Sequence, residues 1–188
     1  MYHVSLRNTE NSWGAPAKLF HWAMAVLIFA QIGLGWAAAG WRLSPLKLNL
    51  FVWHKSLGML ILALAALRIL WRLGSSVPAL PADTPLWERR AARCSHVLLY
   101  ALMIALPVTG WIINSAANVP FSIFWLVPLP AIVGPSKAVE DLAALTHVTL
   151  FVLLALVLLA HIGAALRHHY VKRNTVLARM LPGKAMKA

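Results

Sequence analysis

Histidine is the residue type in this chain whose spacing points to chemistry. The sequence contains eight histidines: His3, His21, His54, His96, His147, His161, His168 and His169. His147 and His161 are 14 residues apart, so on one helix they would share a face to within ~40° and stand ~21 Å apart along the axis. His168 continues the same face. Ionisable residues inside apolar helices are rare and usually functional, so we take these histidines as candidate ligands.

Four apolar stretches supply the helices that would carry these histidines. We expect membrane spans at residues 19–40, 50–71, 94–117 and 142–166. Each has ~20 or more residues, enough to cross a ~30 Å hydrocarbon layer. The composition agrees, because only 12% of residues are charged, against about a quarter in soluble domains. We therefore predict an all-α membrane protein, a bundle of four transmembrane helices in one membrane domain over residues 1–188.

The histidines fall into pairs at two depths. His54 and His147 lie four or five residues from the same end of their spans, and His21 and His161 lie near the opposite end. A porphyrin supplies four nitrogens to its iron and leaves two axial positions, which two imidazoles can fill. Two pairs at two depths therefore predict two stacked b-type haems suited to electron transfer. Spacing alone also allows His96, which is level with His21, to pair with His161, and leaves that choice open.

The cations sort by side of the expected membrane. Of the 17 Lys and Arg residues, 13 lie on the side of both termini: Arg7, Lys18, Arg68, Arg72, Arg89, Arg90, Arg93, Arg167, Lys172, Arg173, Arg179, Lys184 and Lys187. This asymmetry follows the positive-inside rule, so we expect cytoplasmic termini and a basic cytoplasmic tail at residues 167–188. It also accounts for the net charge of +12 without a nucleic-acid partner.

The single cysteine and the third connection set further limits. Cys94 is the only cysteine, which excludes an intramolecular disulfide and covalent haem attachment through a C-x-x-C-H motif. Residues 118–141 are apolar, but prolines interrupt them too often for a lipid-exposed helix: Pro120, Pro128, Pro130 and Pro135. We expect an extracytoplasmic loop that is interfacial or re-entrant and caps the bundle.

Two roles are possible for each of several other residues near the histidines. Arg68 and Arg72 either neutralise haem propionates or snorkel to lipid headgroups, and Lys55 is read as a headgroup anchor. His168 and His169 either protonate a reduced quinone or are solvated surface residues. Several glycines either admit a flat macrocycle or allow close helix packing: Gly33, Gly35, Gly58, Gly110 and Gly163.

The ordered set of short motifs resembles a known family. The matching stretches are FHW at 20–22, HKSLG at 54–58, RILWR at 68–72, HVLLYALMIALPVTGW at 96–111, His147, AHIGAALRHHY at 160–170 and NTVLARM at 174–180. In this order they resemble the bacterial cytochrome b561 family of four-helix, dihaem membrane proteins. The resemblance implies that His21 pairs with His161 and His54 with His147. It leaves His96 near a propionate or a quinone, and Arg173 departs from the acidic residue that members often carry there.

The resemblance also implies a function. It indicates an electron carrier of the bacterial inner membrane that exchanges electrons with a quinone, and some members oxidise superoxide and reduce ubiquinone. The electron donor would be superoxide or a redox protein. One alternative is an anchor subunit of a larger dehydrogenase or hydrogenase, with residues 119–135 as its docking surface. Another is a haem-free transporter or metal carrier, which we disfavour because all five acidic residues lie outside the apolar cores.

Overall fold

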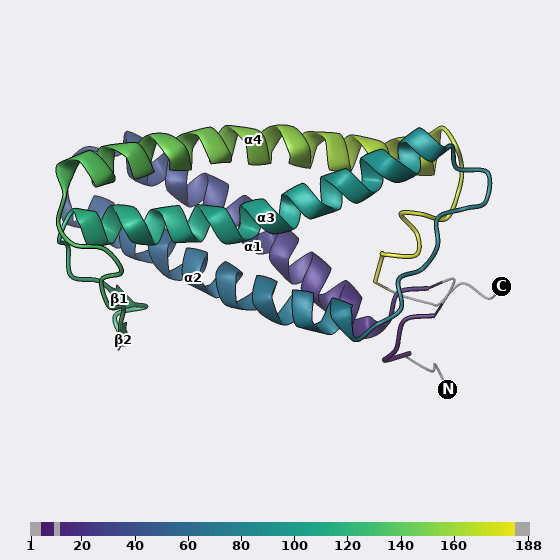
Figure 1. Cartoon of the computed structure of the whole chain (residues 1–188), viewed down its shortest axis with the longest axis horizontal. Coiled ribbons are helices and arrows are strands. Elements are labelled where there is room, and N and C mark those ends of the chain that lie inside the picture. The colour runs from purple at the N-terminus through teal and green to yellow at the C-terminus, as the bar shows by residue number, and fades with distance from the viewer. Residues whose placement is uncertain (1–4, 10–11, 183–188) are drawn as a thin grey trace.

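Four long helices and one short β-hairpin make up the fold (Figure 1). A computed structural model describes residues 5–9 and 12–182. The elements are α1 (Ala15–Gly40), α2 (Pro45–Leu73), α3 (Leu86–Ala116), β1 (Ser122–Ile123), β2 (Val127–Pro128) and α4 (Lys137–Tyr170). All four helices are long and apolar enough to cross a membrane, which confirms the predicted all-α, four-span class. We call the end of the bundle with the two termini the tail end and the opposite end the hairpin end.

The helices extend beyond the expected spans because capping and charge continue them outside the apolar stretches. Ser44 accepts a hydrogen bond from Lys47 N at the start of α2, and Ser136 accepts one from Val139 N at the start of α4. The expected loop at 118–141 therefore ends at Ser136. The helix α4 also runs through Tyr170, so the tail starts after that residue rather than at 167. A search for apolar windows misses such polar helical turns.

The packing leaves α4 apart from two of the other helices. α1 packs against α2, α2 against α3 and α3 against α4, whereas no Cα atom of α4 lies within 8 Å of α1 or α2. A buried cluster at mid-length still joins all four helices: Met24, Ile28, Ile61, Ala65, Leu102, Met103 and Leu154. This cluster separates the two ends of the bundle. At most 22% of any span is buried within the chain, which leaves the outer faces for lipid.

The connection between α3 and α4 differs from the expected irregular cap. β1 and β2 pair antiparallel, with Ile123 opposite Val127. The hairpin lies beside α2 rather than over the helix ends (Figure 1). Phe124 N donates to Ser56 Oγ at 2.8 Å, and the Phe124 ring packs edge-on against Trp53 of α2. The prolines concealed the hairpin, although only Pro128 lies in a strand, at an edge position that tolerates a missing backbone donor.

The described part of the C-terminal tail folds back onto the tail end. Trp22 Nε1 donates to Met180 O at 2.8 Å, and an Arg179 N–H donates to Ala79 O at 2.8 Å. The tail therefore covers the start of α1, next to His21. Lys184 and Lys187, which entered the charge count, and His3 lie outside the described residues.

Candidate functional site: two histidine layers

Three histidines meet near the tail end. The ring centres of His21 on α1 and His161 on α4 lie 6.2 Å apart, and that of His96 on α3 lies 5.5 Å from His161. We call this group the tail-end layer. Proximity alone does not choose between His21 and His96 as the partner of His161, so the ambiguity of the sequence persists in the structure.

Two histidines meet near the hairpin end. The ring centres of His54 on α2 and His147 on α4 lie 6.3 Å apart. We call this pair the hairpin-end layer. Both layers take one imidazole from α4 and one from a helix whose Cα atoms stay more than 8 Å from it. The rings of the two pairs meet at interplanar angles of 52° and 71°, between helices that do not pack directly against each other.

The ring spacings fit a metal atom between two imidazoles. A metal–imidazole nitrogen bond of ~2.0–2.1 Å, with the ring centre ~1 Å further on, would separate two ligating rings by ~6 Å. The pairs at 6.2 and 6.3 Å match that separation. Among the described residues, no group of three or more His, Cys, Asp or Glu side chains is arranged to hold a metal ion. Two protein ligands per layer suit a porphyrin, which brings its own four nitrogens.

Two of the candidate glycines give the hairpin-end rings their room. A Cβ atom at Gly35 would lie 3.0 Å from His54 Cε1, and one at Gly110 would lie 3.6 Å from His147 Cε1. A Cβ at Gly58 would instead meet Gln31 Nε2 at 3.2 Å, so this glycine accommodates a side chain of α1. Gly33 and Gly163 have open space around them. Of these glycines, Gly35 is therefore the one whose missing side chain leaves necessary room for a histidine ring, that of His54.

Hydrogen bonding fixes which ring nitrogen of His147 carries the proton. Thr109 Oγ1 lies 2.9 Å from Leu106 O and 2.9 Å from His147 Nδ1. Because the hydroxyl donates to the carbonyl, it accepts from Nδ1–H, which leaves Nε2 with a free lone pair. Sequence reasoning missed Thr109, although its position directly before Gly110 was a usable signal.

The environment of His54 contains two polar atoms without partners. Gln31 Nε2 donates to His54 O at 2.9 Å. His54 Nδ1 and Gln31 Oε1 are buried and find no hydrogen-bond partner among the described residues. A buried imidazole nitrogen without a partner fits a ring whose surroundings are completed only when a further group binds beside it. Gln31 was also missed, although it is a polar residue in the middle of an apolar span.

Cations surround the tail-end layer. An Arg68 guanidinium nitrogen lies 3.2 Å from His21 Nδ1. Arginine only donates, so Nδ1 accepts here and the proton sits on Nε2. Ligation through Nε2 requires the other tautomer, so it must break this contact and free Arg68 for an anion such as a propionate. The guanidinium groups of Arg68 and Arg72 both lie over the Tyr100 ring, at 5.4 and 5.8 Å.

His168 belongs to a separate charged cluster at the tail end. Its Nε2 lies 3.6 Å from a Glu88 carboxylate oxygen, and its Nδ1 lies 2.8 Å from the Asn174 amide. Glu88 is only 8% exposed and also binds Lys172 at 2.6 Å and Arg167 at 3.1 Å. The hydrogen bond from Lys172 lowers the pKa of the Glu88 carboxyl below its usual value, with Arg167 adding to the effect. Sequence reasoning did not single out Glu88.

His169 and Lys55 make contacts that bear on their alternatives. The His169 ring packs edge-on against Tyr170, with centres 4.8 Å apart, outside the charged cluster. Lys55 Nζ donates to Asn114 Oδ1 at 2.6 Å and lies over the Phe121 ring. Lys55, which we expected to reach lipid headgroups, is therefore tied to α3 and to the hairpin connection.

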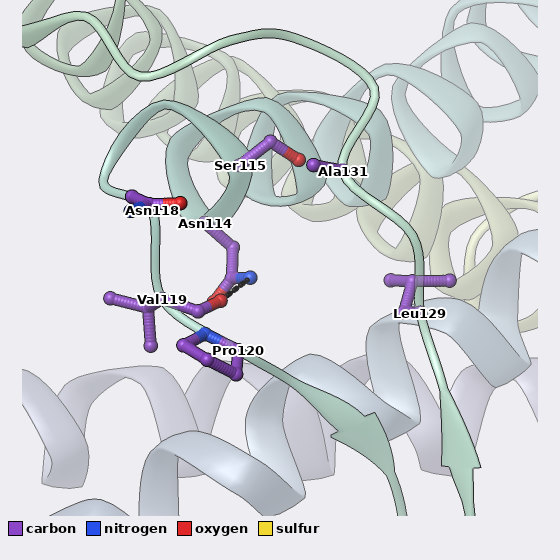
Figure 2. Close-up of a pocket in the computed structure, with 7 residues that line it drawn as sticks. All are labelled: Asn114, Ser115, Asn118, Val119, Pro120, Leu129 and Ala131. Atoms are coloured by element: carbon purple, nitrogen blue, oxygen red, sulfur yellow. Dashed lines mark hydrogen bonds between the residues drawn. The ribbon is translucent and has the colours of Figure 1, made fainter.

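Two cavities lie outside the histidine layers. One of about 130 Å³ at the hairpin end is lined by Asn114, Ser115, Asn118, Val119, Pro120, Leu129 and Ala131. Figure 2 shows it, with the Asn114 amide donating to Val119 O at 2.8 Å. The other, about 630 Å³, lies between the N-terminal segment and the end of α2, and is lined by Arg7, Asn8, Leu70, Trp71, Gly74, Ser75 and Ser76. None of the paired histidines lines either cavity.

Comparisons with known proteins match nearly the whole chain. The profile of the family described as prokaryotic cytochrome b561 matches residues 12–183. Cytochrome b561 homolog 2 of Escherichia coli (strain K12) is 32% identical over 95% of both chains. Cytochrome b561 homolog 1 of the same organism is 28% identical over 92% of this chain and 98% of its own. A probable superoxide oxidase, CybB, of Yersinia pestis is 33% identical over 70% of this chain and 74% of its own. The profile match includes both histidine layers.

Proposed function

We propose, from the premise that the chain belongs to the prokaryotic cytochrome b561 family, that it carries electrons across the membrane between a donor and a quinone. Membership makes it a multi-pass membrane cytochrome with b-type haem. The finer proposal is that it holds two haems, one in each histidine layer. When bound, such haems would supply one-electron transfer, and the chain's own residues would ligate, orient and enclose them.

The observation that carries this proposal is the pair of matching ring distances. His21 and His161 are 6.2 Å apart at one depth, and His54 and His147 are 6.3 Å apart at the other. The two α4 histidines are 14 residues apart, so the layers stand ~21 Å apart along the helix axis. Two sites at that separation would span most of a hydrocarbon layer of ~30 Å.

We assign His21 rather than His96 as the partner of His161. The resemblance favours His21, and its spacing of 6.2 Å nearly equals that of the other pair. The His96–His161 spacing of 5.5 Å is short for two rings that share one metal atom. His96 would then flank the tail-end haem without ligating it.

Reduced-minus-oxidised optical spectra, with haem quantified per chain, test the assignment. We expect two haems in the unmodified protein and about one in His54→Ala and in His161→Ala, because each loses one axial ligand. His96→Ala is the matched control in the tail-end layer and should keep both. A protein without porphyrin, or ligand variants that keep the full spectrum, would refute the proposal.

We further propose superoxide as donor and ubiquinone as acceptor, on the similarity to the probable superoxide oxidase of Yersinia pestis. Two superoxide ions would each lose one electron to become dioxygen, and one quinone would take both electrons and two protons to become a quinol. Purified protein mixed with superoxide and a soluble quinone analogue should consume superoxide faster than spontaneous dismutation does. Consumption at the spontaneous rate would exclude this donor.

His168 is the proposed proton donor to the reduced quinone. It lies between Glu88 and Asn174 at the tail end, and an imidazole ring can both accept and donate a proton. His168→Ala should slow quinone reduction and leave the reduced haem spectrum unchanged. His169→Ala is the adjacent control, because His169 packs on Tyr170 instead. Equal turnover in both variants would remove His168 from this role.

For location we propose the bacterial inner membrane, with both termini in the cytoplasm, on the strength of the charge asymmetry.

The second candidate function is an anchor subunit of a larger dehydrogenase or hydrogenase. The exposed apolar tip of the hairpin, with Leu126 81% exposed, is the observation that favours it. Purification in mild detergent distinguishes the two, because an anchor should bring a stoichiometric second subunit and a self-sufficient carrier should not.

A further inference from the structure

The tip of the hairpin is an exposed apolar surface without charge. Trp125, Leu126 and Val127 are 53%, 81% and 58% exposed, and residues 119–135 contain no charged side chain. Phe124 and Trp125 have positive φ angles of 49° and 62°. Turns in water usually place glycine or asparagine at such positions. The sequence instead puts large aromatic groups there, so the tip favours apolar surface over an unstrained backbone.

The hairpin lies level with the hairpin-end histidine layer along the bundle axis. It contacts α2 through Ser56 and Trp53, on either side of His54 of the hairpin-end layer. Ser56 is 11 residues beyond the first residue of α2, or ~16 Å along the helix axis. The His54 ring is level with Gly35, five residues before α1 ends at Gly40. The hairpin therefore lies alongside the apolar part of the bundle (Figure 1).

The backbone N–H groups of the turn at the tip, from Phe124 to Leu126, are bonded within the chain. Phe124 N donates to Ser56 Oγ at 2.8 Å, and Pro128 has no N–H. The other bonds run from Trp125 N to Ser122 O (3.2 Å), from Leu126 N to Ile123 O (2.9 Å) and from Leu129 N to Phe121 O (2.9 Å). Irregular backbone enters hydrocarbon only when its polar groups are satisfied internally. The bonded N–H groups of the turn meet this requirement.

We propose that the hairpin tip inserts into the lipid leaflet beside α2, where the acyl chains of the bilayer cover its exposed apolar side chains. The three observations agree: the tip is apolar and uncharged, it lies beside the apolar part of α2, and the N–H groups of its turn are bonded within the chain. The Ser56–Phe124 hydrogen bond fixes the hairpin to the span, so insertion would bury Trp125 and Leu126 in lipid while the rest of the connection stays against the bundle. This proposal concerns a lipid contact and does not depend on the haem assignment.

A nitroxide label tests the insertion directly. In a Cys94→Ser background of the haem-loaded protein in phosphatidylcholine vesicles, Leu126→Cys is labelled and its collisions with oxygen and with a water-soluble nickel chelate are measured. Leu43→Cys is the matched control, because Leu43 is 87% exposed beside Arg42 at the same end of the bundle. We expect at least a threefold higher oxygen-to-nickel ratio at residue 126 than at residue 43.

Two outcomes would overturn the proposal. Equal ratios at residues 126 and 43 would place the tip in water. Shielding of residue 126 from both reagents would place it against another protein or a second copy of the chain. Haem content per chain reports whether each variant is folded, and Val127→Cys repeats the measurement if Leu126→Cys is not.

Discussion

The two histidine layers share one helix but differ in what surrounds them. In the tail-end layer, Arg68 touches His21, and a third imidazole, His96, lies beside His161. In the hairpin-end layer the direct partners are neutral, and the nearby cation, Lys55, is drawn to Asn114. Cations favour the reduced, less positive iron, whereas an acceptor on the Nδ1–H of a ligand favours the oxidised iron. If each layer holds a haem, as proposed, the tail-end haem should have the higher midpoint potential and electrons should flow toward it.

The largest expected effect comes from filling the space beside one layer only. Gly35→Val should displace the His54 ring, because even a Cβ atom there lies 3.0 Å from His54 Cε1. We expect haem per chain to fall by about half, measured by the pyridine haemochrome method, with the tail-end signal retained. Gly33→Val is the control two residues away, where a Cβ would meet no atom within 4 Å. A parallel loss in both variants would mean that the helix, not the ring, had been disturbed.

A smaller effect should follow from removing the cation of the tail-end layer. Arg68→Gln should lower the tail-end midpoint potential, by roughly 60 mV if the one-electron equilibrium changes tenfold. The hairpin-end potential should stay nearly constant in a redox titration followed optically. Arg72→Gln serves as comparison, because Arg72 lies over the same Tyr100 ring but one helical turn further along α2 than Arg68. An equal shift of both haems would contradict a local effect.

At the hairpin end the corresponding change has the opposite sign. Thr109→Val removes the acceptor from His147 Nδ1–H, so the hairpin-end potential should rise, by roughly 30 mV for a threefold change in equilibrium. Thr149→Val is the matched control, because its hydroxyl bonds only to Leu145 O on its own helix. A redox titration that left the Thr109→Val protein unchanged would show that this hydroxyl does not tune the ligand.

The difference between the layers also marks what sequence could predict. The apolar stretches predicted the four helices, since a bilayer imposes a long uniform pattern. The 14-residue spacing on α4 placed His147 and His161 in separate layers, because helix geometry is regular. Both inferences rest on repeating geometry within one element.

Contacts between elements could not be predicted from the sequence. Thr109, Gln31 and Glu88 act through partners on other segments, or through a backbone carbonyl that no spacing reveals. The hairpin escaped for a related reason, because Ser56, which binds Phe124 N, lies 68 residues away in the chain. Nor could the sequence choose between His21 and His96, since depth is fixed by spacing but the direction between helices is not.

The smallest expected effect is a pH dependence of thermal stability that arises at the tail end and not at the hairpin end. The Glu88 carboxylate, in the first turn of α3 and six residues before the expected span, helps to hold the tail to the bundle. The hairpin is held to α2 through Ser56 and Trp53, which carry no carboxylate. Lys172, then Arg167, lower the Glu88 pKa from its usual 4.5. A lowered folded-state pKa contributes stability above the unfolded value and loses it as the pH falls through the folded one. Thermal unfolding midpoints of the unmodified protein should therefore decline below about pH 4.5, and those of Glu88→Gln should decline less. Glu140→Gln, at the hairpin end, should follow the unmodified curve; if it flattened the curve as much as Glu88→Gln, the acid sensitivity would not belong to the tail.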